Sequence, residues 1–211
     1  MKYEWKKQDK QIYLPKNKPE TIKLPSFNYF SLSGKGNPNS DAYAEAIGVL
    51  YSLCYGIKMM PKSGIVPEGY YEYSIFPLEG VWDLTEEGKK KTALDKDELL
   101  YTIMIRQPDF VTAQLAYEVI EKVKLKKPNP LLETVAFSSL EEGLCIQMLH
   151  LGPFDEEPQS FARMEQYCTD NGMQRISHVH KEIYLTDVRR TQPHKLKTVL
   201  RFAAKPIDGL I

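Results

Sequence analysis

The clearest alternation of apolar and polar side chains runs from Ser177 to Asp187. Successive side chains of a strand point to opposite faces, so this stretch has two distinct faces. One face carries Val179, Lys181, Ile183 and Leu185, and the other carries His178, His180, Glu182 and Tyr184. Glutamate is depleted in strands, so Glu182 in the middle of a face asks for an explanation. The pattern predicts a strand whose polar face is either exposed to solvent or lines a pocket.

Further segments have the composition and the turn boundaries of strands. They are residues 27–34, 70–76, 99–106, 144–153 and 195–203, and residues 80–84 could form another short strand. Glycine or proline ends several of these segments, as expected where an extended run stops. Glu72 lies in the middle of the segment at 70–76.

Apolar residues at spacings of three and four predict helices between these strands. Asn37 is the expected N-cap of the first helix, which ends near Pro61. Asp109 is the expected N-cap of a second helix at 109–127, and Asp155 that of a third. The inner stripe of the third helix is Phe161, Met164 and Cys168. Its first turn holds Glu156, Glu157 and Pro158, with the acids at the positive end of the helix dipole.

The order strand, glycine, helix, strand, strand occurs twice, which suggests an internal duplication. Gly34 corresponds to Gly152, and Glu72 corresponds to Glu182. A β-α-β-β unit has one helix on one face of a small antiparallel sheet. The predicted fold is therefore α+β, with tandem β-α-β-β repeats, antiparallel sheets, helices on one side and a concave ligand groove on the other. This arrangement places Glu72 and Glu182 near a pseudo-two-fold axis.

The predicted organisation is a short N-terminal lead-in followed by one domain. Residues 1–24 have no sustained periodicity and form the lead-in. The domain spans 25–211, with the first repeat at about 25–107 and the second at about 140–206. The helix at 109–127 connects them.

Composition narrows the possible partners. Basic and acidic residues number 28 each, which argues against nucleic acid or an anionic membrane as the main partner. Cys54, Cys145 and Cys168 lack metal or redox spacing and are expected to pack as small apolar groups in a reducing compartment. No stretch has the apolar length of a membrane span or the apolar core of a signal peptide, so a cytoplasmic location is expected.

The last two predicted strands carry a family resemblance. The run from Glu182 to Asp187, followed by 195–201 and preceded by the Gly152-Pro153-Phe154 corner, resembles the GyrI-like small-molecule-binding domain. Together with the duplicated pattern, the resemblance covers roughly residues 22–206. It implies a groove that accepts bulky, flat or amphipathic compounds, with Glu182 as the carboxylate that meets the ligand.

The Tyr- and Trp-containing first half is similar to the stand-alone branch described as cyclopropanoid cyclopropyl hydrolases, which detoxify DNA-alkylating natural products. Other members of the family are effector domains attached to a helix-turn-helix. The first predicted strand begins near Phe27, which leaves little room for that module, so a sensor role is disfavoured.

The resemblance implies a cofactor-independent hydrolase in which Glu182 is the base that activates water. Tyr71 or Tyr184 is then the donor to the carbonyl that takes up charge as a strained ring opens. The other expected ligand-binding residues are Glu72, Tyr73, Trp82, Tyr101, Phe154 and His180. Aromatic residues at such positions more often belong to the core. The alternative function is drug or toxin binding without turnover, with Glu182 pairing with a cationic or hydrogen-bonding ligand.

Metal and cofactor chemistry has little support in the sequence. His178 and His180 share a strand face, but no third ligand at a catalytic-zinc spacing accompanies them. Phosphate-binding glycine loops and the nucleophile motif G-x-S-x-G are absent from the sequence. We therefore expect a hydrophobic or aromatic small-molecule ligand, and neither a metal nor a cofactor.

Overall fold

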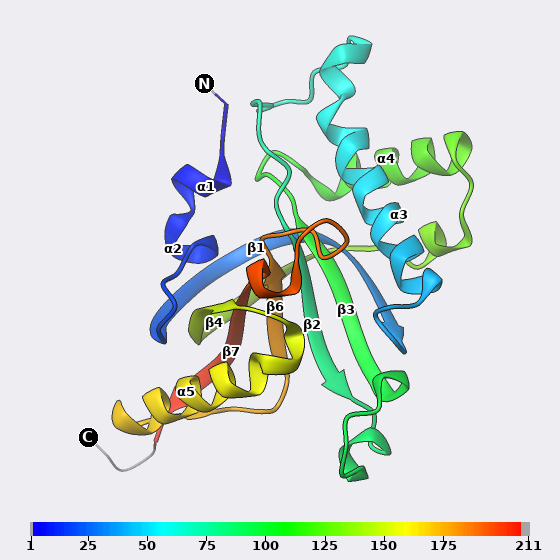
Figure 1. Cartoon of the computed structure of the whole chain (residues 1–211). Helices are drawn as coiled ribbons and strands as arrows, with labels where there is room; N and C mark the ends of the chain where they lie inside the picture. The colour runs from blue at the N-terminus through cyan, green and yellow to red at the C-terminus, as the bar shows by residue number, and fades with distance from the viewer. Residues whose placement is uncertain (1, 208–211) are drawn as a thin grey trace. The chain divides into compact units, whose positions relative to one another are not determined.

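The computed structural model describes residues 2–207, and the chain folds as an α+β protein with antiparallel strand pairs (Figure 1). It divides into two compact units, each assembled from segments that are distant in the sequence. The first unit comprises residues 2–5, 27–78 and 84–140. The second unit comprises residues 6–26, 79–83 and 141–207.

The first unit is built on a strand pair and two helices. Its elements are most of β1 (Glu20–Lys35), α3 (Asp41–Lys58), η1 (Met60–Ser63), η2 (Gly88–Lys90), η3 (Lys96–Glu98), β3 (Leu99–Arg106), α4 (Ala113–Lys126) and η4 (Pro130–Glu133). β1 pairs antiparallel with β3, with Tyr29 opposite Arg106. α3 packs against β3 and α4 because Leu50, Leu53 and Ile57 repeat on one side of the helix and are fully buried.

The second unit has β7 (Lys197–Pro206) at its centre. Its other elements are most of α1 (Trp5–Gln8), α2 (Lys10–Tyr13), the centre of β2 (Leu78–Leu84), the second half of β4 (Ala136–Leu151), η5 (Phe154–Glu156), α5 (Glu157–Asp170), β5 (Met173–Arg175), β6 (His180–Tyr184) and η6 (Pro193–Lys195). β7 pairs antiparallel with β4, β5 and β6, and β2 is the other neighbour of β6. The predicted α+β fold with two strand-helix-strand-strand units is confirmed.

The sheet of the second unit has one apolar face and one charged face. On the apolar face, Met148 and Leu200 lie opposite one another and pack with Met164 and Cys168 of α5. Glu182 is the β6 partner of Leu200, and side chains directly opposite one another project to the same face. Glu182 therefore lies on the face that α5 covers. The expectation that it lines the face opposite the helices is wrong in this unit.

The segment at 70–76 is not a strand, which corrects a second expectation. Within residues 2–207 it forms a single isolated bridge, from Tyr73 to Tyr3. Tyr71 and Tyr73 pack their rings against Phe110 at centroid distances of 5.3 and 6.0 Å. Aromatic residues promote strands only where a neighbouring strand accepts them, and here they pack into a local ring cluster. Glu72 is exposed and lies outside any strand, so its structural equivalence with Glu182 is wrong. The strand in this part of the chain is β2 instead, and it includes the segment at 80–84 that the sequence suggested as a short strand.

All three helices begin later than predicted. α3 is capped by Ser40, whose side chain accepts from the backbone N–H of Tyr43, whereas Asn37 instead accepts from Asn39 in a tight turn. α4 is capped by Thr112 rather than by Asp109. The turn η5 comes before α5, so Asp155 is not its cap. Asn, Asp, Ser and Thr can each make caps or turns, and the choice depends on the path of the chain.

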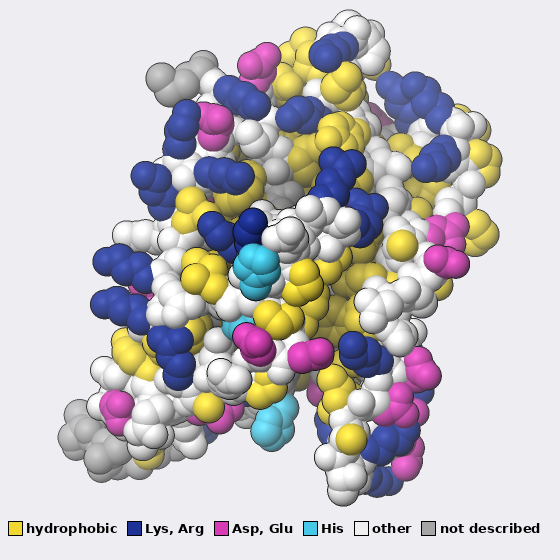
Figure 2. All heavy atoms as spheres, in the orientation of Figure 1, with side chains coloured by type: hydrophobic (Ala, Val, Ile, Leu, Met, Phe, Trp, Pro, Cys, Tyr) yellow, Lys and Arg dark blue, Asp and Glu magenta, His cyan; other side chains and the backbone are white. Residues whose placement is uncertain are grey.

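The N-terminal lead-in is more ordered than the sequence suggested, since it contains α1, α2 and the start of β1. Tyr13 and Pro15 are buried in the second unit. Lys6, Lys7 and Lys10 are exposed, and Figure 2 shows Lys and Arg side chains gathered over α1 and α2. The segment thus covers part of the second unit with its apolar side and keeps its basic side in water.

Candidate active site

Glu182 is the centre of a hydrogen-bonded cluster inside the second unit. The residue is 9% exposed. The Tyr184 hydroxyl donates to Glu182 Oε2 at 2.8 Å, and His180 Nε2 lies 3.1 Å from Glu182 Oε1. The i and i+2 spacing of strand residues places all three side chains on one face, as the alternation predicted.

Aromatic side chains surround this cluster. Trp82 of β2 donates from Nε1 to the Tyr184 hydroxyl oxygen at 2.8 Å. Phe154 packs edge-on against Tyr184 at a centroid distance of 6.1 Å, and Phe161 of α5 packs against His180 at 4.8 Å. Trp82 therefore fixes the direction of the tyrosine hydroxyl, because a hydroxyl that accepts from the indole turns its own proton towards Glu182.

The predicted site residues fall into two groups. Trp82, Phe154, His180, Glu182 and Tyr184 all belong to the second unit and are connected by the contacts above. The remaining predicted residues, Tyr71, Glu72, Tyr73 and Tyr101, belong to the first unit. Tyr71 and Tyr73 are part of the ring cluster around Phe110, and Tyr101 packs edge-on against Tyr43 at 4.9 Å.

Glu157, the first residue of α5, is a member of the cluster that the sequence analysis did not assign to the site. It is 7% exposed and shares a hydrogen bond with Glu182. Burial raises the pKa of the Glu157 carboxyl far above its ordinary value, and the Glu182 carboxylate raises it further. The helix N-terminus opposes this shift by only about 0.3–1 kcal/mol, whereas burying a charged carboxylate costs several kcal/mol. Burial prevails, so the neutral acid is the favoured form of Glu157.

A signal for Glu157 was present in the sequence. Positions 157, 161, 164 and 168 follow the helical spacing of four, three and four, so Glu157 belongs to the same inner stripe as Phe161, Met164 and Cys168. Acids are common in the first turn of a helix because they interact favourably with the helix dipole, and this interaction alone accounts for an acid at position 157. Glutamate is rarely buried without a partner, so an acid on the buried stripe of a helix indicates a candidate site residue.

The opposite face of the same strands carries a different set of charges. Lys181 donates to Glu79 and to Glu142, each at 2.9 Å, and Arg201 donates to Glu142 at 3.1 Å. Arg201 also donates to the backbone carbonyl of Ile12 at 2.7 Å. Although burial works to raise it, Lys181 and Arg201 together hold the pKa of Glu142 below its usual range. Acid and base are paired here, so this face is a structural network that attaches α2.

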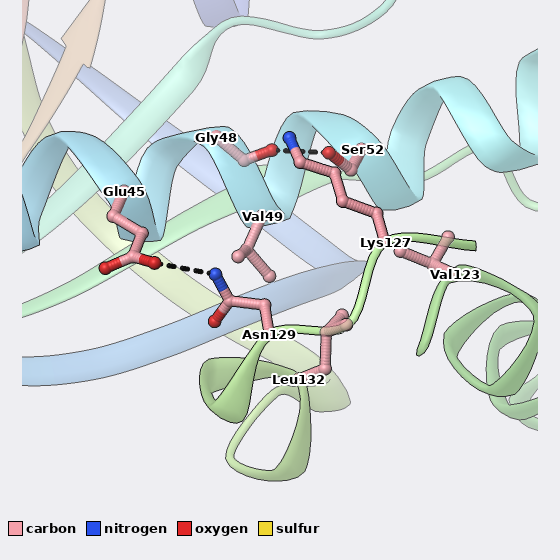
Figure 3. A pocket seen from close by; sticks show the side chains of 8 residues that line it. All are labelled: Glu45, Gly48, Val49, Ser52, Val123, Lys127, Asn129 and Leu132. Atoms are coloured by element: carbon pink, nitrogen blue, oxygen red, sulfur yellow. Dashed lines mark hydrogen bonds between the residues drawn. The ribbon is translucent and has the colours of Figure 1, made fainter. Parts of the chain in front are cut away.

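A cavity of about 170 Å³ lies in the first unit and is lined by residues of α3, the end of α4 and η4 (Figure 3). Two pairs of its polar groups are joined by hydrogen bonds. Asn129 donates to Glu45 at 2.7 Å, and Ser52 donates to the Gly48 carbonyl at 2.8 Å. The side chains lining it include no pair of neighbouring acids, and it contains none of the predicted site residues. The candidate active site is therefore the Glu182 cluster and not this cavity.

Metal ligands do not assemble within residues 2–207: no group of three His, Cys, Asp or Glu side chains there could hold an ion. His178 is exposed, and its backbone carbonyl faces the His180 ring. Cys54, Cys145 and Cys168 are buried as free thiols, as expected for small core residues. None of the helices described is long and apolar enough to cross a membrane.

The fold is α+β, and the Glu182 cluster combines two glutamates with aromatic side chains. Residues 17–204 match the sequence profile of the GyrI-like small-molecule-binding domain, and the chain belongs to this family. No curated protein sequence matches the chain.

Solved structures from Listeria innocua are similar over nearly their whole length. One described as a hydrolase encoded by lin2189 is 38% identical, with a TM-score of 0.89, over 97% of this chain and 100% of that chain. Another described as a hydrolase is 36% identical, with a TM-score of 0.87, over 96% and 100%. The EcmrR C-terminal domain is 12% identical over 93% of this chain and 99% of that chain, with a TM-score of 0.52, and shares the fold alone.

Proposed function

We propose that this protein is a cofactor-independent hydrolase that detoxifies bulky hydrophobic xenobiotics, and that cyclopropane-bearing DNA alkylators are its substrate class. The observation that carries the proposal is a buried carboxylate, Glu182, held by a tyrosine hydroxyl at 2.8 Å and an imidazole at 3.1 Å among aromatic side chains. The description of two relatives at 36% and 38% identity as hydrolases supports it. A cytoplasmic location fits this role and is part of the proposal.

The proposed reaction adds water across a strained ring bond. Glu182 takes a proton from water while the water oxygen bonds to the ring carbon, and the breaking ring bond gives its electron pair to the conjugated carbonyl. Once Glu182 is protonated it no longer needs the Tyr184 hydrogen bond, and the Tyr184 hydroxyl turns and gives its proton to that carbonyl oxygen. Glu182 then returns the proton taken from water to Tyr184 through their 2.8 Å hydrogen bond. The two side chains end the cycle as they began it, and the product contains one added water.

The geometry leaves room for this chemistry on Glu182. A carboxylate has about four lone-pair positions. Tyr184, His180 and Glu157 occupy three of them, so one remains for a water molecule. Tyr71, the other tyrosine that the sequence suggested as a donor, is fixed in the ring cluster of the first unit. Tyr184 is therefore the donor in this proposal.

The test is multiple-turnover hydrolysis of a spiro-cyclopropyl cyclohexadienone present in large excess. Wild-type protein should form the ring-opened hydrated product over many turnovers. Glu182→Gln keeps the shape but cannot accept the proton, so kcat should fall on the order of 100-fold or more with little change in ligand affinity. Glu68→Gln, at an exposed position, is the matched control and should behave as wild type. Equal activity of Glu182→Gln and wild type would refute the role of Glu182.

The alternative function is binding and sequestration without turnover, which the small-molecule-binding character of the family favours. A binder protects one equivalent of target for each protein molecule, whereas an enzyme continues. Consumption that stops at one equivalent for the wild type would exclude hydrolysis of this substrate and leave the binding function.

A further inference from the structure

Two carboxyl groups that share a hydrogen bond must contain a proton. Ionised carboxylates only accept hydrogen bonds, so the contact between Glu157 and Glu182 requires one of them to be a carboxylic acid. Both residues are buried, at 7% and 9% exposed. Water therefore has little access to the pair, and the proton in the contact belongs to one of the two carboxyl groups.

The surrounding contacts decide which carboxyl keeps the proton. Glu182 accepts from the Tyr184 hydroxyl and faces His180 Nε2, so two donors stabilise a negative charge on it. Oε1 of Glu157 is buried and has no hydrogen-bond partner within residues 2–207. A carboxylate oxygen in that position would be costly, whereas a carboxylic acid needs an acceptor, and Glu182 is that acceptor.

We propose that Glu157 and Glu182 share one proton at neutral pH, with Glu157 as the acid and Glu182 as the carboxylate, and that Glu157 is a positioning residue for Glu182. The neutral acid donates to Glu182 and fixes the orientation of its free lone pair. The catalytic consequence rests on the proposed hydrolase function. The shared proton does not depend on it.

Other charged or titratable groups also face this pair. They are Asp155 in η5, and His180 and Tyr184 on β6, while Glu156 and His150 lie beside Gly152. Asp155 raises the pKa of Glu157 in the same direction as burial does. His150 is occupied by Ser160 and by the Pro153 carbonyl, at 2.9 and 3.0 Å.

The shared proton is tested on the free protein by infrared spectroscopy at pH 7, using the carbonyl stretch of a protonated carboxylic acid. Wild type should show this band, and Glu157→Gln should lose it. Glu156→Gln, which changes the neighbouring exposed acid, is the matched control and should keep the band. In Glu182→Gln the neighbouring charge is removed, so the band should disappear at a lower pH than in wild type. Absence of the band in wild type, or its persistence in Glu157→Gln, overturns the proposal.

The positioning role is tested by the pH dependence of kcat with the same cyclopropyl substrate. Loss of the Glu157 proton places two charges side by side, so wild-type kcat should fall on the alkaline side. Glu157→Gln keeps an N–H donor that does not titrate, so this alkaline fall should vanish. Glu157→Leu has no donor and should lose about tenfold or more in kcat with a smaller effect on KM.

An alkaline fall that persists in Glu157→Gln would overturn the positioning role. If wild type turns over no substrate, the proposed function fails, while the infrared measurement still decides whether the proton is shared. The two failures are therefore distinguishable.

Discussion

Replacing Lys181 by methionine should strongly destabilise the protein, because it removes a cation that two buried carboxylates share. Lys181 is 4% exposed, and its ammonium donates to Glu79 and Glu142 at 2.9 Å each. Methionine keeps the length and apolar stem of the side chain, so the change is mainly one of charge. Glu79 is only 1% exposed and retains the Tyr13 hydroxyl, a weaker partner at 3.2 Å.

The expected loss is about 3–5 kcal/mol, the usual cost of leaving one member of a buried ion pair unpaired. No reduction for solvent screening applies, because both Lys181 and Glu79 are almost fully buried. For a chain of this size the loss corresponds to a Tm lower by on the order of 10 °C. Lys195→Met, at an exposed position, is the matched control and should change stability by less than about 0.5 kcal/mol.

The measurement is urea unfolding followed by fluorescence, with the double variant Lys181→Met/Glu79→Gln included. Glutamine removes the unpaired charge and keeps an oxygen for Tyr13, so the double variant should be more stable than Lys181→Met alone. The difference between wild type and Lys181→Met should also shrink at acidic pH. Glu142 has a depressed pKa in the fold, so its stabilisation is present above its unfolded pKa and is lost as the pH falls. Strictly additive effects, or a loss below about 1 kcal/mol for Lys181→Met, would refute this account.

Two further results are expected. The folded pKa of Glu157 is raised, so its contribution to stability is complete below the unfolded pKa and is lost as the pH rises towards the folded value. The free energy of unfolding of wild type should therefore fall, relative to that of Glu157→Gln, by about 1.4 kcal/mol for each pH unit between about 4.3 and the raised folded pKa. Denaturant titrations at several pH values measure this difference, and a difference that does not change with pH would contradict the reasoning. Burial raises the pKa of the Cys54 thiol to about 12, so a thiol reagent at neutral pH should label Cys54 only after unfolding, as mass spectrometry can establish. Rapid labelling of the native protein would show that the thiol is accessible.

The part of the site that lies on one strand could be predicted from the sequence. The period of two in β6 fixes His180, Glu182 and Tyr184 on one face whatever the sheet packs against. The alternation did not show which face α5 would cover, because Val179, Ile183 and Leu185 make the other face look apolar despite Lys181. Lys181 is buried by ion pairs rather than by apolar contacts, and the period does not distinguish the two.

The parts that depend on tertiary contacts were predicted less well. Glu157 becomes a site residue only because α5 places it against Glu182. The 70–76 segment has the composition of a strand, but its rings find partners in Tyr3 and Phe110. Residue type also could not separate Ser40 from Asn37 as a helix cap, since both side chains accept backbone hydrogen bonds.

The attachment of the N-terminal segment has a consequence for how the sequence can vary. Arg201 and Gln147 hold this segment by donating to the backbone carbonyls of Ile12 and Gln11, at 2.7 and 2.6 Å. Every amino acid provides such a carbonyl, so residues 11 and 12 are free to change as long as the chain follows the same path. A random-mutagenesis library selected for folded protein should therefore accept many residues at 11 and 12 and very few at 147 and 201. The segment would then look dispensable in an alignment although the fold depends on its backbone.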